Sequence, residues 1–355
     1  MNNFSMSYRG KKVYIGIDVH KKSYVFTAIC EDEIIKRARV DASSANFIQQ
    51  LKDWFKYAQV YSAYEAGFSG FHLHRQLVTA GIKNIVVNPA SIPVKANDKT
   101  KTDKRDSLKI CQTLVAGMLK PIYVPSKKEE LARLLPRTRD QLVKIRTKVG
   151  NQFKSKLYQF GLMEGQDDKI ISQKFIDETL ERTDLDIELE MVLEILAEQW
   201  KSLHKQICKI EKLMETQASK EPKIEKIYRS VPGVGEISSR ILSTELGDMK
   251  RFSNQKKLFS YTGLTPSEYS SGPHIRKGHI SRQGSNRLRQ VLTEIAWRAI
   301  KEDPALRDSF ERISIKAGKK KAIVGIARKI IGRMRACFMN NQEYQIGVGY
   351  AFGQV

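Results

Sequence analysis

The chain has 355 residues, and 62 Lys and Arg residues against 39 Asp and Glu residues give it a formal net charge of +23. This positive excess indicates phosphate-bearing partners such as nucleic acid, and it says little about the fold. An apolar content of 41% supports packed cores, and the length predicts two or three domains. The sequence has no run of about 18 apolar residues that could cross a bilayer, no apolar signal segment near its start, and four cysteines without metal-type spacing. We therefore expect a cytoplasmic protein in a reducing compartment, with no membrane partner.

Residues 10–125 are predicted to form a mixed α/β domain. Apolar runs predict strands at 13–19, 24–30, 34–40, 60–64 and 82–87. Capping residues and apolar spacing predict helices at 43–56, 70–80 and 103–119. The order is a three-stranded meander followed by alternating strands and helices, which is typical of a mixed sheet with helices packed against it.

Four acids in this domain occupy positions that suit a shared site. Asp18 and Glu65 each end a predicted strand, where open sheets place functional side chains, although both could be ordinary strand-end acids. Asp103 and Asp106 open a predicted helix, and a spacing of three residues places them on one helix face. Neighbouring bases could instead neutralise the helix pair as an ordinary exposed cluster, namely Lys101, Lys104 and Arg105.

A sheet that brings both strand ends near that helix would make the four carboxylates converge. Like charges held so close raise one another's pKa unless a cation lies between them. Carboxylate oxygens suit hard cations such as Mg²⁺. Two such ions about 4 Å apart can activate an attacking oxygen and stabilise a leaving one, so convergence would indicate phosphoryl transfer.

Residues 126–222 are predicted to form an antiparallel coiled-coil arm. Apolar residues recur at helical spacing over 129–160, with a restart near Pro136, and heptad spacing continues over 185–214. The polar segment 161–183 between them is expected to be less regular. Such an arm could separate two working domains or join two protomers.

Residues 223–355 are predicted to form a mostly helical domain that binds nucleic acid. Helical residues, a turn with Pro232, Gly233 and Gly235, and a helix at 236–246 give the pattern of a helix-hairpin-helix, although a plain turn between helices would look similar. Helices are also expected at 287–300 and 316–335, and the latter carries many bases. The basic side chains expected to contact nucleic acid are Arg276, Lys277, Arg282, Arg287, Lys319 and Lys320.

Several short motifs follow one another in an order that resembles a known family. They are Ile15-Gly16-Ile17-Asp18, Tyr64-Glu65-Ala66-Gly67, Asn88-Pro89-Ala90, Lys101-Thr102-Asp103-Lys104-Arg105-Asp106, Pro232-Gly233-Val234-Gly235, Gly263-Leu264-Thr265-Pro266, Ser271-Gly272 and the segment 282–289. In this order they resemble the DEDD-type transposases of bacterial insertion sequences, the family numbered one-hundred-and-ten, also called bridge-RNA-guided recombinases. The resemblance covers nearly the whole chain.

This resemblance implies a RuvC-like, RNase H-type first domain, a coiled-coil arm and a C-terminal transposase domain. It implies that Asp18, Glu65, Asp103 and Asp106 hold Mg²⁺, and that Ser271, with Ser270 as the alternative, forms a covalent serine–DNA intermediate. It also implies a noncoding bridge RNA that pairs with double-stranded donor and target DNA. Because strand exchange needs several active sites, a dimer or tetramer is expected, acting at the nucleoid.

Two other functions remain compatible with the residues. A metal-dependent structure-specific nuclease, such as a Holliday-junction resolvase, would use the same acids to activate water. A non-catalytic RNA-binding scaffold with a decayed RNase H fold is the other alternative. The histidines His20, His72 and His74 are interpreted as structural.

Overall fold

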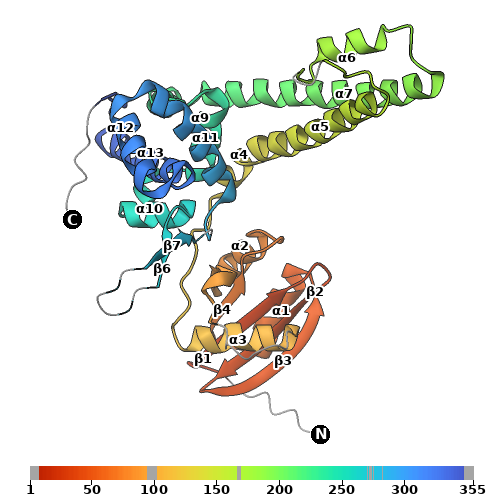
Figure 1. The fold of residues 1–355 in the computed structure, drawn as a ribbon. Coiled ribbons are helices and arrows are strands. Elements are labelled where there is room, and N and C mark those ends of the chain that lie inside the picture. The colour runs from red at the N-terminus through yellow and green to blue at the C-terminus, as the bar shows by residue number, and fades with distance from the viewer. Residues whose placement is uncertain are drawn as a thin grey trace. The chain divides into compact units, whose positions relative to one another are not determined.

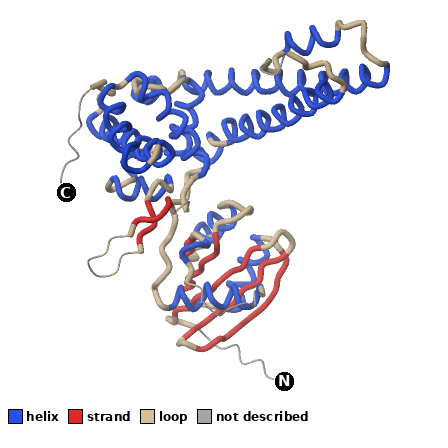
Figure 2. The backbone as a smooth tube through the Cα atoms, viewed as in Figure 1, coloured by secondary structure: helices blue, strands red, loops and turns tan. Residues whose placement is uncertain are grey.

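The computed structural model describes residues 8–93, 102–165, 169–269, 271, 274, 276–281 and 283–347, with Lys277 described by its backbone alone. The chain divides into two compact units, Met1–Pro125 and Ser126–Val355. The first unit is mixed α/β and the second is mostly helical, as the sequence predicts (Figure 2). The predicted separation of 126–222 from 223–355 as two domains stays a prediction.

The first unit contains a five-stranded sheet in the order β3-β2-β1-β4-β5 (Figure 1). Strands β1, β2 and β3 form an antiparallel meander, and β4 and β5 continue the sheet in parallel with β1. All five predicted strands are therefore confirmed, and each strand end lies within one residue of its predicted position. They are β1 Lys12–Val19, β2 Ser23–Cys30, β3 Glu33–Asp41, β4 Gln59–Glu65 and β5 Lys83–Val87.

Alternation along β1 divides its side chains between two helical layers. Val13, Ile15 and Ile17 are fully buried in one core with side chains from α1 (Ser44–Trp54) and α2 (His72–Thr79). On the opposite face the even-numbered position Gly16 lies directly beneath α3 (Asp103–Val115). The sheet is thus covered by helices on both faces, and α3 covers the face on which Gly16 lies.

The approach of α3 to the sheet is close because Gly16 has no side chain. A Cβ atom at Gly16 would lie 2.2 Å from the Ser107 carbonyl oxygen and 2.3 Å from the Cys111 backbone nitrogen. The buried hydroxyls of Thr27 and Ser107 are 3.0 Å apart, and the Cys111 thiol donates to the Tyr14 carbonyl oxygen at 3.1 Å. Burial raises the pKa of the Cys111 thiol to about 12, so it stays neutral. These contacts hold α3 close against the sheet.

In the second unit the two long helices α5 (Leu134–Gln159) and α7 (Ile187–Ala218) lie side by side (Figure 1). Buried side chains such as Phe153, Leu193 and Trp200 form their shared core. A short helix, α4 (Lys127–Ala132), precedes α5, and a capping box of Ser126 and Glu129 begins it. The sequence predicted that the helix restarts near Pro136, and α5 begins two residues before that proline, at Leu134.

One prediction for this unit was wrong. The segment 161–183 was expected to be less regular, but it contains α6 (Gln173–Leu180), which Ser172 caps. Phe175 and Ile176 bury this helix in the core of α5 and α7. Eight residues with few apolar positions give little periodicity, so tertiary packing decides that this helix forms.

The rest of the second unit packs around one large apolar core. Its helices are α8 Pro222–Arg229, α9 Glu236–Leu246, α10 Gln255–Thr262, α11 Asn286–Glu302, α12 Pro304–Ala317 and α13 Lys319–Asn340, with a hairpin of β6 Pro266–Glu268 and β7 Lys277–Ile280. Two expected bounds were wrong. The predicted linker at 216–223 is mostly helical, because α7 continues to Ala218 and α8 starts at Pro222. The helix expected at 316–335 starts at Lys319, because Gly318, with φ of +79°, separates it from α12.

Candidate active site

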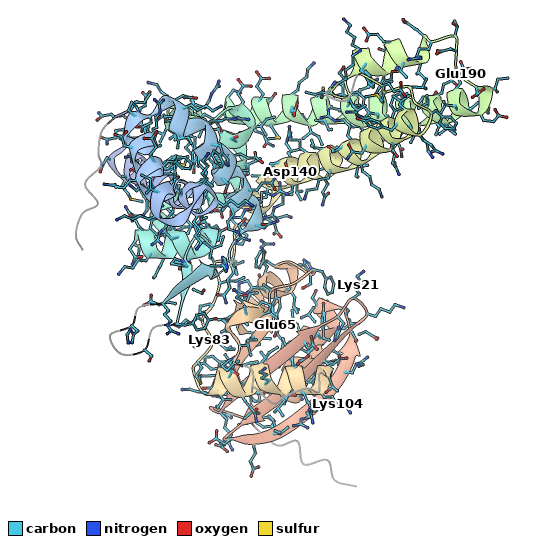
Figure 3. All side chains as sticks on the ribbon, in the orientation of Figure 1. Lys21, Glu65, Lys83, Lys104, Asp140 and Glu190 are labelled. Atoms are coloured by element: carbon cyan, nitrogen blue, oxygen red, sulfur yellow. The ribbon has the colours of Figure 1, made fainter. Side chains whose placement is uncertain are left out.

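Asp18 and Glu65 lie at the same edge of the sheet, because β1 and β4 are parallel neighbours. The last residues paired in register are Ile17 and Tyr64, and the two acids follow at the next position of each strand. Alternation along each strand places both acids on the face of Gly16 and its partner Ala63, which α3 covers. Figure 3 labels Glu65 at this strand end.

Asp103 and Asp106 are in the first turn of α3. Thr102 has an extended backbone, and its hydroxyl accepts a hydrogen bond from the Arg105 backbone N–H, so it caps the helix. The partial positive charge at this helix end favours carboxylates in the first turn. The packing of α3 over Gly16 therefore holds two helix-end carboxylates over the face that carries Asp18.

Asp18 and Asp103 are joined by His20. The imidazole Nε2 of His20 is 3.1 Å from Asp18 Oδ2 and 3.4 Å from Asp103 Oδ2. One ligand atom from each of the three residues lies within 4.8 Å of the other two, so they could hold a single metal ion. All three side chains are only partly exposed, at 22%, 42% and 38% for Asp18, His20 and Asp103. They are thus partly shielded from water and remain accessible from outside.

The electrostatics of this cluster favour a bound cation. Burial raises the pKa of Asp18, the nearby imidazole of His20 lowers it, and the negative charges of Asp103 and Asp106 raise it further, with a net upward shift. A divalent cation between these groups would remove the repulsion and favour their charged forms. Two carboxylates and an imidazole are a donor set that divalent metals accept, so the residues fit the group.

A second basic group reaches the cluster from the edge of the sheet. Arg39 on β3 donates from Nη2 to Asp103 Oδ2 at 2.5 Å, and its side chain is 64% exposed. Asp103 therefore contacts a guanidinium, which is always charged, in addition to the His20 imidazole.

The structure brings together most of what the sequence predicted for this unit. Asp18 and Asp103 share a contact, Asp106 acts on Asp18 through its charge, and Glu65 lies at the same strand edge. Their roles as ligands stay predictions. Lys101, which opens the motif around Asp103, lies outside the described residues.

Sequence reasoning missed His20 and Arg39. The interpretation of His20 as structural stays a prediction, but its position two residues after Asp18, just beyond β1, could have indicated the contact between the two side chains. The other two histidines lie within hydrogen-bonding distance of side chains outside the acidic cluster. The His74 imidazole is 2.7 Å from Asn84 Oδ1, and His72 Nε2 is 3.4 Å from the Ser44 hydroxyl. For Arg39 the sequence contains no comparable signal, because its contact depends on strand register.

In the second unit, Ser271 lies in the loop of the β6–β7 hairpin. Its backbone N–H and carbonyl oxygen exchange hydrogen bonds of 3.3 Å with those of His274, and the residue is exposed. The Tyr269 N–H donates to the Arg276 carbonyl oxygen at 2.9 Å on the same hairpin. Of the remaining loop predictions, Ser270, Gly272 and Arg282 lie outside the described residues, as does the side chain of Lys277.

The other predicted nucleic-acid contacts differ in their surroundings. Lys319 and Lys320 are exposed in the first turn of α13. Arg287 donates to the Pro136 carbonyl oxygen at 3.0 Å and pairs with Asp140, and its side chain is only 22% exposed. Arg287 thus ties α11 to α5, and a role in nucleic-acid binding stays a prediction for all three.

Comparison with protein families gives two matches on this chain. Residues 15–161 match a transposase family model of the DEDD type of IS110, and residues 225–311 match a model described as the transposase IS116/IS110/IS902 family. The first match spans the acids at Asp18, Glu65, Asp103 and Asp106, and the second spans Ser271.

Curated relatives agree with both matches. A putative transposase of Sinorhizobium fredii is 28% identical over 299 residues, covering 81% of this chain and 72% of the relative. The transposase for an insertion sequence element of Leptospira borgpetersenii is 27% identical and covers 94% of this chain and 97% of its own length. A probable family 20 transposase of Pseudomonas aeruginosa is 24% identical, with 78% and 81% covered. Together these matches support a DEDD transposase of the IS110 family.

Similarity to these transposases supports an enzymatic role in DNA processing, and the DEDD family implies dependence on a divalent metal. Among the described residues, the acidic cluster around Asp18 and Asp103 could bind such a metal ion. None of the described helices of the chain has both the length and the apolarity that crossing a membrane requires.

Proposed function

We propose that this insertion-sequence transposase is a bridge-RNA-guided recombinase that cuts and rejoins DNA through a Mg²⁺-dependent serine–DNA intermediate. The observation that carries the proposal is the meeting of Asp18, His20 and Asp103 under the first turn of α3, in a chain whose relatives are transposases. The proposed substrates are double-stranded donor and target DNA, and the proposed guide is a noncoding RNA.

Asp18, Glu65, Asp103 and Asp106 would hold the Mg²⁺ ions in this proposal. Bound Mg²⁺ supplies Lewis-acid stabilisation of the charge that develops on a phosphoryl group under attack. The family matches support a divalent metal, and a ligand set of four carboxylates would favour Mg²⁺.

The Ser271 hydroxyl is the proposed nucleophile. Its oxygen forms a bond to a DNA phosphorus as the bond from phosphorus to the leaving oxygen of the strand breaks. The serine proton passes to solvent, and the leaving oxygen takes up a proton to become a free hydroxyl. A free hydroxyl of another strand then attacks the phosphoserine and restores Ser271, so no net hydrolysis occurs.

This reaction requires one scissile phosphate to reach both the acids and Ser271, whichever protomers supply them. A dimer or tetramer is proposed because strand exchange joins several cut ends. Arg276, Lys277 and Arg282 would hold the phosphate near Ser271, and Lys319 and Lys320 would bind further along the nucleic acid. The proposed location is the cytoplasm, at the nucleoid.

We also propose a finer architecture for the chain. The meander of β1 to β3 continued by parallel β4 and β5 supports a RuvC-like, RNase H-type domain. The shared core of α5 and α7 supports an antiparallel coiled-coil arm. The turn between α8 and α9, with φ of +79° at Gly233, supports a helix-hairpin-helix.

A covalent-adduct assay tests the proposal. The full chain is incubated with Mg²⁺, guide RNA and DNA carrying the element ends, and adducts are detected after denaturation. Ser271→Ala should abolish the adduct while RNA binding survives, and Ser281→Ala, in the same hairpin region, should retain it. An adduct that persists in Ser271→Ala would move the nucleophile elsewhere, with Ser270→Ala as the next variant.

The nuclease alternative predicts a different product. If the acids activated water, DNA would carry nicks with free ends and no protein would be attached. The comparisons do not favour this function, because the named relatives above are transposases.

A further inference from the structure

Arg39 belongs to β3, and β3 is the outermost strand of the sheet, next to β2 (Figure 1). In the strand register, Arg39 is opposite Val25, and Val25 is opposite Asp18. Residues directly opposite one another in a sheet point to the same face. The side chain of Arg39 therefore projects toward the first turn of α3, where it meets Asp103.

The ion pair between Arg39 and Asp103 is too exposed to contribute much to the stability of the fold. The two side chains are 64% and 38% exposed, and ion pairs this exposed contribute little to stability. The pair does, however, hold a guanidinium at a group that would bind metal. A guanidinium has five N–H donors in a rigid fork, and the contact of Nη2 with Asp103 leaves donors available for a second acceptor.

Strand alternation separates Arg39 from the other bases of β3. Lys36 points to the opposite face, where its ammonium lies 4.3 Å from the centre of the Trp54 ring. Arg37 is opposite Thr27 and shares the face of Arg39, and both arginines are exposed. The acid-bearing face of β3 thus presents two guanidinium groups in a row, spaced by two residues along an open sheet edge.

We propose that Arg39 is a phosphate-binding residue of the active site, which grips the DNA phosphate held at the metal-loaded acids. The inference rests on the proposed function, because it needs a DNA phosphate at this cluster. With a divalent cation bound at Asp103, the guanidinium of Arg39 would lose its place at that carboxylate. Its fork would then be available to the non-bridging oxygens of the bound phosphate, for which the bidentate geometry of arginine is suited. Arg37 extends the same track to the neighbouring phosphate.

The experiment separates DNA binding at the site from binding elsewhere on this basic chain. Anisotropy of a labelled DNA duplex is measured with the full chain at fixed ionic strength, once in EDTA and once in Mg²⁺. The gain in affinity on adding Mg²⁺ is compared among wild type, Arg39→Ala, Arg39→Lys and the control Lys36→Ala. Binding of Mn²⁺ alone, without DNA, is titrated for the same variants and for Asp103→Asn.

In Arg39→Ala, the factor by which Mg²⁺ raises DNA affinity is expected to be about tenfold smaller than in wild type. This is the effect of losing one charged hydrogen-bonded contact. Arg39→Lys should recover only part of it, since an ammonium lacks the fork. In EDTA, Arg39→Ala and Lys36→Ala should change DNA affinity by a similar small factor. Arg39→Ala should bind Mn²⁺ at least as tightly as wild type, because the competing guanidinium is gone, whereas Asp103→Asn should bind it more weakly.

Two results would overturn the inference. One is an unchanged Mg²⁺-dependent gain in Arg39→Ala. The other is a loss of Mn²⁺ affinity in Arg39→Ala that matches Asp103→Asn, since Arg39 would then only position a ligand. A wild-type chain with no Mg²⁺-dependent gain and no Mn²⁺ binding would instead contradict the proposed function itself.

Discussion

Gly16 of β1 and Ser107 of α3 are in direct contact, and no side chain fits between them. A Cβ atom on Gly16 would lie 2.2 Å from the Ser107 carbonyl oxygen, well inside the limit that carbon and oxygen atoms tolerate. Because both partners are backbone, neither can move aside without shifting the helix. This contact sets the height of α3 above the sheet, and thereby the distance from Asp103 to Asp18.

Gly16→Ala is predicted to destabilise the first unit and to disrupt the acid cluster. Overpacking a core typically lowers the free energy of unfolding by about 1–3 kcal/mol. Because the added methyl group would clash with backbone atoms, we expect a loss of about 3 kcal/mol here. Chemical denaturation gives the change in stability, and Mn²⁺ titration of the folded variant gives the change at the site. The control is Gly67→Ala, where the nearest atom to a Cβ is 4.0 Å away. Equal stability of Gly16→Ala and wild type would show that α3 does not depend on this contact.

Asp18→Asn is predicted to stabilise the metal-free protein at neutral pH. The folded-state pKa of Asp18 is raised by burial and by Asp103 and Asp106, so its charged form is disfavoured in the fold. An acid with a raised folded pKa binds more protons folded than unfolded between the two pKa values. The loss of folding stability that Asp18 causes is therefore absent below its unfolded-state pKa, near 3.8. This loss grows as the pH rises through the folded-state pKa of Asp18.

Thermal unfolding in EDTA across pH 4 to 8 checks this prediction. The gap in Tm between Asp18→Asn and wild type should widen as pH rises and then level off. A gap that is constant with pH would exclude the titration of Asp18 as its cause. Adding Mg²⁺ should reverse the order, because the variant lacks a charged ligand.

Divalent metal is predicted to stabilise the wild-type chain, and Glu65→Gln is predicted to reduce that effect. Binding to the folded state alone adds about 2.7 kcal/mol when the ligand is at 100 times its Kd. A tenfold loss of affinity would remove about 1.4 kcal/mol of it. The measurement is Tm against Mg²⁺ concentration. Glu31→Gln is the control, because Glu31 lies in the β2–β3 turn and pairs with Lys11 at 2.7 Å. A full Mg²⁺ effect in Glu65→Gln would remove Glu65 from the ligand set.

Asp303→Ala is predicted to destabilise the second unit by about 3 to 5 kcal/mol. Asp303 is fully buried, lies 3.1 Å from Arg333 Nη1, and accepts from the Tyr344 hydroxyl at 2.5 Å. It also caps α12 by accepting from the Ala305 N–H at 2.9 Å. Removing it leaves a buried guanidinium without its counter-charge. Denaturant unfolding provides the measurement, and the exposed Asp308→Ala on the same helix should change stability by no more than about 0.5 kcal/mol. Similar losses in both variants would contradict the importance of the buried pair.

The sequence determined the order of strands and helices in the first unit and the positions of its acids. Apolar runs of period two are local, so β1 to β5 could be read from them, and each strand-end acid followed directly from where its run stops. The long helices α5 and α7 were equally readable, since their apolar spacing persists over many turns. The short helix α6 was not, because it depends on contacts with α5 and α7 that no local pattern records.

The tertiary structure alone decided how the acids meet and what surrounds them. The parallel pairing of β1 with β4 put Asp18 and Glu65 at one edge, and the missing side chain of Gly16 let α3 bring Asp103 to His20. The contact of Arg39 with Asp103 needed the register of three strands. Sequence patterns encode what each segment does by itself, whereas distances between segments follow from how closely their backbones can pack.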